Sequence, residues 1–392
     1  MPYVDRVVHD ADSHIFEPPG YAEAYADPAI RASLADALRP ITGDQQAFFD
    51  QALAKQADPD YRADDEEQVL LRKNHVAIGA VLRDDRPRAL DLLGFTSQLV
   101  FTTTYLAALT RLERGQDQDL AYGLATGHNR GMVDFCGADR RLLPVCFVPL
   151  GDPERAAGCA RQAIDLGAAA LMVTSAPLRT RSQSHVGFDR VWAQAEEAGV
   201  PIVLHVGGEQ TMAPVYKDNG LPPVPDFHGG DANFTSVSYM AIPHAPMQTL
   251  STLIFDGVMD RFPRLRWGVI ELGASWVPGW MRSMDSAAEA FRRNEERLQS
   301  LSALPSEIVR RQIRVTPYPH EPAGWIVEHC GAEIPMFSSD YPHVEGGRNP
   351  LKRFEASLAG RSDAEKQAFY CDNFADLMGP VLDRLLPAGV AT

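Results

Sequence analysis

Ile334-Pro335-Met336-Phe337-Ser338-Ser339-Asp340-Tyr341-Pro342-His343 is the stretch of this sequence that decides the fold. A short apolar run stops at an aspartate, and a proline and a pair of glycines follow within a few residues. This pattern is typical of a strand whose last residue points into a site. In an α/β barrel the chemical groups lie at the C-terminal ends of the strands. The stretch therefore predicts a barrel strand that ends at Asp340, with the imidazole of His343 close by.

Seven other apolar runs resemble this one, and most of the eight are followed by a helical pattern. Alternating strand and helix patterns indicate parallel βαβ units. Eight such units favour a closed barrel over an open sheet. The predicted fold class is therefore α/β, a (β/α)8 TIM barrel. The eight predicted strands are residues 7–12, 98–103, 142–148, 169–174, 202–205, 267–271, 313–316 and 335–339.

Two connections between the predicted strands are unusually long. Residues 17–97, after the first strand, are rich in Ala, Asp and Gln and are interpreted as a helical insertion that covers the barrel mouth. Residues 206–245, after the fifth strand, are rich in Gly, Pro and His and are typical of an active-site loop. Residues 363–392 are expected to form closing helices. No internal repeat or linker is visible, so residues 1–392 are expected to form a single domain.

Composition excludes several classes of partner. The chain has 392 residues, 45% of them hydrophobic, and a formal net charge of −15 with its basic residues scattered. This charge argues against nucleic acid and against anionic membranes as partners. No apolar stretch approaches the length of a membrane span.

The N-terminal residues and the cysteines indicate a cytoplasmic protein. The first six residues lack the basic and apolar regions of a signal peptide. The cysteines number five and form no CxxC pair. They are interpreted as reduced and mostly buried thiols.

Potential metal ligands stand at the ends of four predicted strands. Asp12 and His14 close the first strand and, two residues apart, face the same way. His205 ends the fifth strand, Glu271 the sixth and Asp340 the eighth. Mixed histidine and carboxylate ligands suit Zn, Mn or Fe rather than a thiolate-bound metal. The sequence predicts a divalent metal site from these five residues.

Two histidines in the following loops extend this set. His320 follows the seventh strand and His343 follows Asp340. If both converge with Glu271, a second metal can bind beside the first. Each residue also has a purely structural explanation: His205 can be a satisfied core histidine, and Glu271 can cap the next helix. The shared strand-end placement favours the metal site.

These motifs together resemble the amidohydrolase-related metalloenzymes typified by aminocarboxymuconate-semialdehyde decarboxylase and the resorcylate decarboxylases. The resemblance covers most of the chain and implies a (β/α)8 barrel. It implies that Asp12, His14, His205 and Asp340 bind a metal that activates water or holds a substrate carboxylate. It rests on Asp12-Ser13-His14, Leu204-His205, Phe-Asp-Gly-Val-Met-Asp-Arg-Phe-Pro-Arg-Leu-Arg-Trp at residues 255–267, Glu-Leu-Gly-Ala-Ser-Trp-Val-Pro at residues 271–278, and Ser339-Asp340-Tyr341-Pro342.

The chain departs from the decarboxylase pattern at two positions. Glu271 stands where those enzymes carry a histidine that orients the metal-bound water, and His343 replaces a phenylalanine-like residue. Both changes add potential ligands rather than proton shuttles. A few members of this barrel family are non-haem diiron monooxygenases that hydroxylate terpenoid-type acids, and a site rich in Glu and His suits such chemistry.

Two enzymatic functions follow. The first is hydrolysis or non-oxidative decarboxylation of a small carboxylic acid through a metal-activated water, with Glu271 as general base and Asp340 essential. The second is a diiron monooxygenase that uses Asp12, His14, His205, Glu271, His320, Asp340 and His343. A barrel that only binds a ligand is a third interpretation, and the full ligand set argues against it.

The sequence contains no motif that identifies the substrate. The aromatic residues Phe227, Phe234, Tyr239 and Trp276 indicate room for an apolar body, and Arg130 or Arg348 can grip a carboxylate. The expected partner is a small molecule. The resemblance is compatible with a homodimer and does not require one.

Overall fold

The computed structural model describes residues 6–42, 45–71, 73–207, 212–225 and 235–385. Phe227 and Phe234 of the predicted pocket lining lie outside these ranges, as do residues 386–392 of the predicted closing helices. No helix in the described part of the chain combines the length and apolar character that crossing a bilayer demands.

Parallel strands form the centre of the molecule. Within the described residues, seven strands make one sheet in the order of the sequence, each hydrogen-bonded to the next. Every strand residue is buried, as expected for a parallel sheet covered on both faces. The strands are β1 (His9–Ile15), β2 (Ser97–Thr102), β3 (Leu142–Phe147), β4 (Ala170–Met172), β5 (Ile202–His205), β6 (Trp267–Ile270) and β7 (Ile313–Val315).

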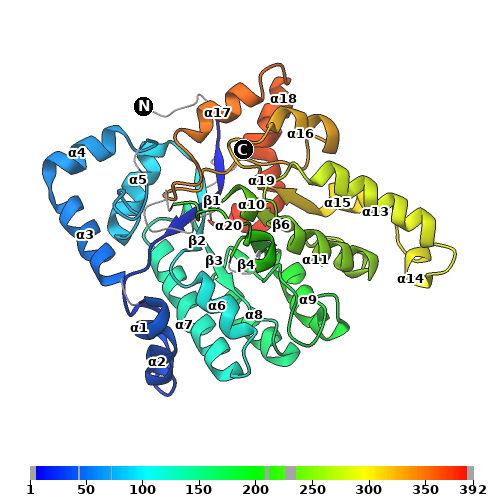
Figure 1. Cartoon of the computed structure of the whole chain (residues 1–392), viewed down its shortest axis with the longest axis horizontal. Helices are drawn as coiled ribbons and strands as arrows, with labels where there is room; N and C mark the ends of the chain where they lie inside the picture. Colours follow the sequence, from blue (N-terminus) through cyan, green and yellow to red (C-terminus); the bar gives the residue numbers. More distant parts are fainter. Residues whose placement is uncertain (1–5, 43–44, 72, 208–211, 226–234, 386–392) are drawn as a thin grey trace.

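Helices fill the connections, and Figure 1 shows them ranged around the strands, with the helices between β1 and β2 at one side. Those between β1 and β2 are α1 (Tyr21–Tyr25), α2 (Arg31–Thr42), α3 (Gln45–Ala57), α4 (Pro59–Glu67), the 3-10 helix η1 (Arg83–Asp85) and α5 (Arg86–Leu93). Between β2 and β5 lie α6 (Leu106–Glu113), α7 (Gln118–Cys136), α8 (Pro153–Leu166), η2 (Val186–Phe188) and α9 (Asp189–Ala198).

The second half of the chain repeats this arrangement. Between β5 and β7 lie η3 (Pro214–Lys217), α10 (Ser236–Tyr239), α11 (His244–Phe255), α12 (Val258–Arg261), α13 (Val277–Phe291), α14 (Glu296–Gln299) and α15 (Pro305–Gln312). After β7 come α16 (Ala323–Cys330), α17 (Pro350–Ser357), α18 (Asp363–Gln367), the π-helix η4 (Ala368–Asp372), α19 (Asn373–Met378) and α20 (Pro380–Leu385).

The unit from β3 to β4 illustrates how local sequence sets these boundaries. Asp152 caps α8 by accepting a hydrogen bond from the backbone N–H of Arg155, and Pro153 occupies the first turn. Gly167 ends the helix with a φ angle of 104°, which a residue with a side chain rarely adopts. The next strand follows within a few residues.

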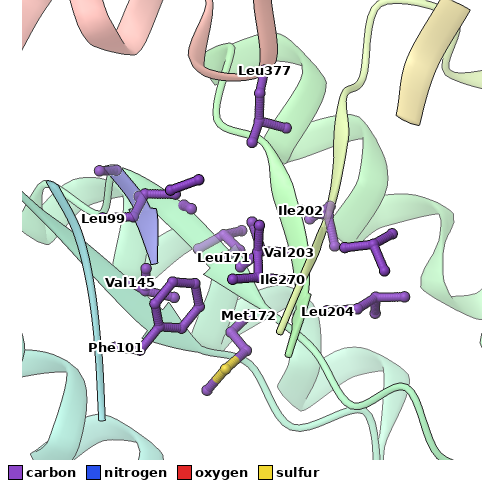
Figure 2. Close-up of a cluster of buried hydrophobic side chains, with 14 of the residues drawn as sticks. Leu99, Phe101, Val145, Leu171, Met172, Ile202, Val203, Leu204, Ile270 and Leu377 are labelled. Atoms are coloured by element: carbon purple, nitrogen blue, oxygen red, sulfur yellow. The ribbon is translucent and has the colours of Figure 1, made fainter. Parts of the chain in front are cut away.

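The hydrophobic core joins the strands to the C-terminal helices. Figure 2 shows Leu99, Val145, Leu171, Val203 and Ile270, from five successive strands, gathered in one cluster with Leu377 of α19. Gly268 permits the close packing, because a Cβ atom there would lie 3.0 Å from Val203 and 3.2 Å from Leu377.

The predicted eighth strand is the main difference from the sequence analysis. Residues 335–339 do not form a regular strand; isolated bridges join Pro335 to β7 and Tyr341 to β1. The ladder is interrupted because Phe337 donates its N–H to the carbonyl of Phe369, and Ser339 donates its N–H to the carboxylate of Asp10. The fold is thus a mixed α/β arrangement with a curled parallel sheet, consistent with a TIM-barrel-like fold.

Candidate metal centre

The carboxyl ends of the strands bring distant residues together. Asp12 and His14 lie in β1, whose pairing with β2 shifts register between Asp10 and Ser13. His205 is the last residue of β5 and pairs with Ile270 of β6, so Glu271 follows directly beside it.

Asp340 reaches the same region through the interrupted eighth segment. Its N–H donates to the carbonyl oxygen of Asp12, and the N–H of His14 donates to the carbonyl oxygen of Tyr341. These bonds fix the segment against β1 and place the Asp340 carboxylate beside the β1 ligands.

The ligand atoms converge around the Nε2 atoms of the two strand histidines. His14 Nε2 lies 3.2 Å from Asp12 Oδ1, 3.6 Å from Asp340 Oδ1 and 3.9 Å from Glu271 Oε2. His205 Nε2 lies 3.4 Å from Asp12 Oδ1 and 3.3 Å from Glu271 Oε2. All five side chains are buried, so these charges meet in a region shielded from solvent.

Two overlapping groups of four can each hold a cation. One consists of Asp12, His14, His205 and Glu271, and the other of His14, Glu271, Asp340 and His343; within each group the ligand atoms lie within 4.8 Å of one another. His14 and Glu271 belong to both groups. The second group brings Glu271 and His343 together, but the second metal expected from the sequence also required His320, which belongs to neither group.

Hydrogen bonds to backbone carbonyls indicate the tautomers of the two strand histidines. His14 Nδ1 lies 3.0 Å from the carbonyl oxygen of Thr102, and His205 Nδ1 lies 2.7 Å from that of Val206. A carbonyl oxygen only accepts, so each Nδ1 carries a proton and donates it. In the neutral ring the lone pair is then on Nε2, which faces the carboxylates. This is how a carbonyl group usually orients a metal-binding histidine.

These residues fit a divalent cation. Asp12 Oδ2, His14 Nε2 and Asp340 Oδ2 are buried and find no hydrogen-bond partner among the described residues. Buried polar atoms without a partner are uncommon and costly. A cation that prefers nitrogen and oxygen ligands, such as Zn, Mn or Fe, bound next to His14 Nε2 would satisfy atoms of this kind.

The electrostatics of the cluster favour positive charge. Burial and the neighbouring Asp12 raise the pKa of Asp340 to about 7. Burial also raises the pKa of Asp12, but the imidazoles of His14 and His205 outweigh it and bring that pKa below the usual value. Burial and His343 lower the pKa of His14 to about 4, so its ring is neutral at pH 7.

Two of the acidic residues have positive φ angles. The φ angles of Glu271 and Asp340 are 52° and 51°, in the left-handed region that side chains other than those of Asn and Asp seldom enter. Such conformations concentrate at functional sites, where the surrounding structure holds them.

His343 lies at the edge of the cluster, partly buried. Its Nδ1 is 3.0 Å from Asp340 Oδ1, its Nε2 is 2.8 Å from Thr103 Oγ1, and its ring centroid is 4.0 Å from that of His14. Both ring nitrogens therefore have polar neighbours in the protein, and direct binding of a metal would require His343 to give up one of them.

His320 is placed apart from the other predicted ligands. Its side chain is exposed, its ring stacks on Tyr318 at 5.4 Å, and it belongs to neither group of four. Arg130 is also occupied elsewhere, since its guanidinium donates to the Tyr25 carbonyl and to Asp27.

Several residues outside the predicted set of ligands support the cluster. The buried Asp10 accepts hydrogen bonds from the N–H and hydroxyl of Ser339 and from Gln98, which anchors the segment directly before Asp340. The buried guanidinium of Arg86, at the start of α5, donates to the carbonyl of His14. The sequence indicates a role for Asp10, because it stands two residues before Asp12 on the same strand.

Lys73 has no sequence signal at all. It comes from the long connection between β1 and β2, yet its Nζ donates to the carbonyl oxygen of Ser339 at 2.9 Å. Burial lowers the pKa of its ammonium group, while the carboxylate of Asp340 acts in the opposite direction. The connection therefore supplies a lysine amine next to the metal ligands.

Comparison with solved structures gives the same fold. An amidohydrolase from Mycobacterium avium subsp. paratuberculosis aligns with a TM-score of 0.71 and 21% identity, over 96% of this chain and 100% of that one. The 5-carboxyvanillate decarboxylase of Novosphingobium aromaticivorans, complexed with manganese and a nitrobenzoic acid, gives 0.64 and 18%, over 95% and 96%. The 2,6-dihydroxybenzoate decarboxylase of Rhizobium gives 0.60 and 16%, over 95% and 98%.

Sequence comparison identifies the family. No curated protein sequence matches this chain. Residues 75–379, most of the chain, match the sequence model described as amidohydrolase. The chain belongs to the amidohydrolase family.

Proposed function

We propose that this chain is a divalent-metal enzyme that hydrolyses or decarboxylates a small carboxylic acid. The observation that carries the proposal is that His14 Nε2, Asp12 Oδ2 and Asp340 Oδ2 are all buried without a hydrogen-bond partner among the described residues, while the other oxygen of each carboxylate lies within 3.6 Å of His14 Nε2. Asp12, His14, His205 and Asp340 are the proposed ligands. A bound cation would supply an electrophile that acidifies water and attracts a substrate carboxylate.

The other residues of the cluster have separable roles in this proposal. Glu271 Oε2, 3.3 Å from His205 Nε2, lies where it can take a proton from water or return one to the product. His343 donates from Nδ1 to an ionised Asp340 and holds one of its oxygens, while Thr103 holds the opposite side of the ring. Burial of the cluster excludes bulk water and strengthens these interactions.

The family supports this reaction class at a coarse level. Two of the solved structures described above are decarboxylases of carboxylated phenols, and one of them contains manganese. Their substrates suggest small aromatic carboxylic acids as first probes for this chain.

A turnover experiment tests this function. Protein stripped by a chelator is reloaded with Mn²⁺ and incubated with a panel of carboxylic acids that includes 2,6-dihydroxybenzoate and 5-carboxyvanillate. The proposal expects release of CO₂ or a hydrolysis product that depends on the added metal, does not need dioxygen, and is lost in Glu271→Gln. Equal turnover by stripped and reloaded protein would contradict it.

A diiron monooxygenase is the second candidate, and one observation favours it. His14, Glu271, Asp340 and His343 form a second group of potential ligands that overlaps the first. None of the three solved structures described above is named as an oxygenase, and His320 lies outside both groups. About two irons per chain, with dioxygen consumed on adding an apolar acid, would favour this candidate over the first.

A further inference from the structure

Glu271 is held in its left-handed conformation by hydrogen bonds at both of its backbone groups. Its N–H donates to Thr316 Oγ1 at 2.9 Å, and its carbonyl oxygen accepts the hydroxyl of Tyr318 at 2.6 Å. Because a φ of 52° is seldom adopted by a glutamate, the conformation persists only where neighbours stabilise it. These two hydrogen bonds stabilise the left-handed conformation of Glu271.

Both partners come from the end of the neighbouring strand. Thr316, which follows β7, is buried, and its N–H donates to the carbonyl of Val269 in β6. The hydroxyl that meets Glu271 is therefore fixed to the sheet itself. Tyr318 is two residues further along, and its ring packs against Tyr239 and His320.

A buried carboxylate, Glu321, fixes Tyr318 in turn. It accepts the N–H of Tyr318 at 2.7 Å and the N–H groups of Ala274 and Ser275 at 3.0 and 2.8 Å. Glu321 thus ties the loop after β7 to the loop that follows Glu271. The hydrogen bond to Glu321 thus fixes the backbone of Tyr318, from which the phenol reaches the Glu271 carbonyl.

We propose that Thr316 and Tyr318 are positioning residues that hold the Glu271 carboxylate against His14 and His205. The inference rests on the proposed function, in which that carboxylate contributes to the metal centre. Each of them contacts a backbone group of Glu271, so each acts through Glu271. Their hydroxyl groups replace the backbone bonds that a regular continuation of β6 would have made.

Binding of Mn²⁺ to metal-free protein tests the inference without a substrate. Glu271 is a member of both ligand groups, so its negative charge supports a bound cation whether it coordinates or acts as a base. Glu271→Gln is expected to weaken Mn²⁺ binding. Thr316→Val and Tyr318→Phe each remove one hydroxyl and are expected to weaken it about 10- to 100-fold, the usual range for a residue that orients a ligand.

A double-mutant comparison separates positioning from general damage. If the two residues act through Glu271, Thr316→Val and Tyr318→Phe cause no further loss in the Glu271→Gln background. Losses that multiply in that background would overturn the inference. The inference would also be overturned if Thr316→Val and Tyr318→Phe each bound Mn²⁺ like the parent protein while Glu271→Gln bound it more weakly. That result would not contradict the proposed function. Unchanged affinity in Glu271→Gln itself would remove Glu271 from the metal centre and overturn the inference; the proposed function, whose four ligands are other residues, is tested separately by turnover.

Two matched variants serve as controls. Thr316→Ser keeps the hydroxyl that accepts the Glu271 N–H and is expected to bind Mn²⁺ within about twofold of the parent protein; a loss as large as that of Thr316→Val would overturn the role of the hydroxyl. Tyr122→Phe removes a hydroxyl that donates to the carbonyls of Pro149 and Asp152, neither of which belongs to a ligand group. It makes the same chemical change as Tyr318→Phe, and an equal loss of affinity would also overturn the inference.

Discussion

The imidazole of His343 holds one oxygen of Asp340 and leaves the other for a metal. His343 Nδ1 is 3.0 Å from Asp340 Oδ1, while Asp340 Oδ2 is buried and has no hydrogen-bond partner among the described residues. The carboxylate is thus oriented from outside the centre. This relationship makes His343 a supporting residue in a centre with one metal, and a ligand only if a second metal displaces its present contacts.

Replacement of His343 measures which role it has. His343→Ala is expected to retain one metal per chain and to bind it about 10- to 100-fold more weakly, because Asp340 loses the group that orients it. Metal content and Mn²⁺ affinity are read together. His329→Ala, which removes an exposed histidine stacked on Trp325, is the control and should match the parent protein. Loss of one of two metals per chain would instead identify His343 as a ligand.

Acid is expected to weaken metal binding through Asp340. Its pKa in the metal-free protein is raised to about 7, so below pH 7 the cation must displace a proton. Burial lowers the pKa of the second ligand histidine, His205, but Asp12 outweighs it and raises that pKa above its usual value, so this ring must also lose a proton. Mn²⁺ affinity should therefore fall at least about tenfold per pH unit from pH 7 down to pH 5. His14, with a pKa of about 4, adds a further proton only in stronger acid. Affinity that is flat between pH 5 and 8 would show that Asp340 is not a ligand.

Asp340 itself is expected to be indispensable. Asp340→Ala removes the carboxylate that the proposal assigns to the metal, so turnover should be abolished while the protein still unfolds cooperatively in urea. Asp84→Ala, at an exposed position in η1, is the matched control and should retain full activity. Turnover by Asp340→Ala at the parent rate would refute the assignment of the site.

Packing around Asp340 predicts that a larger residue in place of Gly346 destabilises the folded protein. A Cβ atom there would collide with the carbonyl oxygen of Ser339 and lie 2.7 Å from Asp340 Cβ. Gly346→Ala is expected to lower the free energy of unfolding by about 1–3 kcal/mol, the usual effect of overpacking, and to weaken Mn²⁺ binding.

The control for this experiment is a glycine with open surroundings. Gly158 lies inside α8, and a Cβ atom added to it would meet no other atom within 4 Å beyond its own helix backbone and chain neighbours. Gly158→Ala should raise the free energy of unfolding by about 0.5–1 kcal/mol through helix propensity. Equal stability of the two alanine variants would show that Gly346 is not a packing constraint.

The strand-end residues were predictable because a parallel sheet has simple geometry. Asp12 and His14 share a face through their spacing, and His205 and Glu271 meet because β5 and β6 are neighbours in register. The apolar runs that precede these residues carried the signal. The α/β class and the parallel sheet followed from the same pattern and are confirmed.

The remaining features depend on contacts that no local pattern encodes. The eighth strand is irregular because Asp10 and Phe369 take the N–H groups that a ladder would use. Lys73 contacts Ser339, which lies far from it in the sequence. The position of His320 after the seventh strand predicts a ligand. The loop after β7 instead turns around Glu321, which accepts the N–H of Tyr318, and His320 is exposed.

The central claim is that Asp12, His14, His205 and Asp340 hold one divalent cation. Anomalous diffraction from crystals of the protein loaded with Mn²⁺ tests it most directly. The account predicts one manganese peak per chain, bonded to Nε2 of both histidines and to oxygens of both aspartates, with His343 still beside Asp340. A peak away from these residues, or two peaks of equal height with His343 bound to one of them, would contradict it.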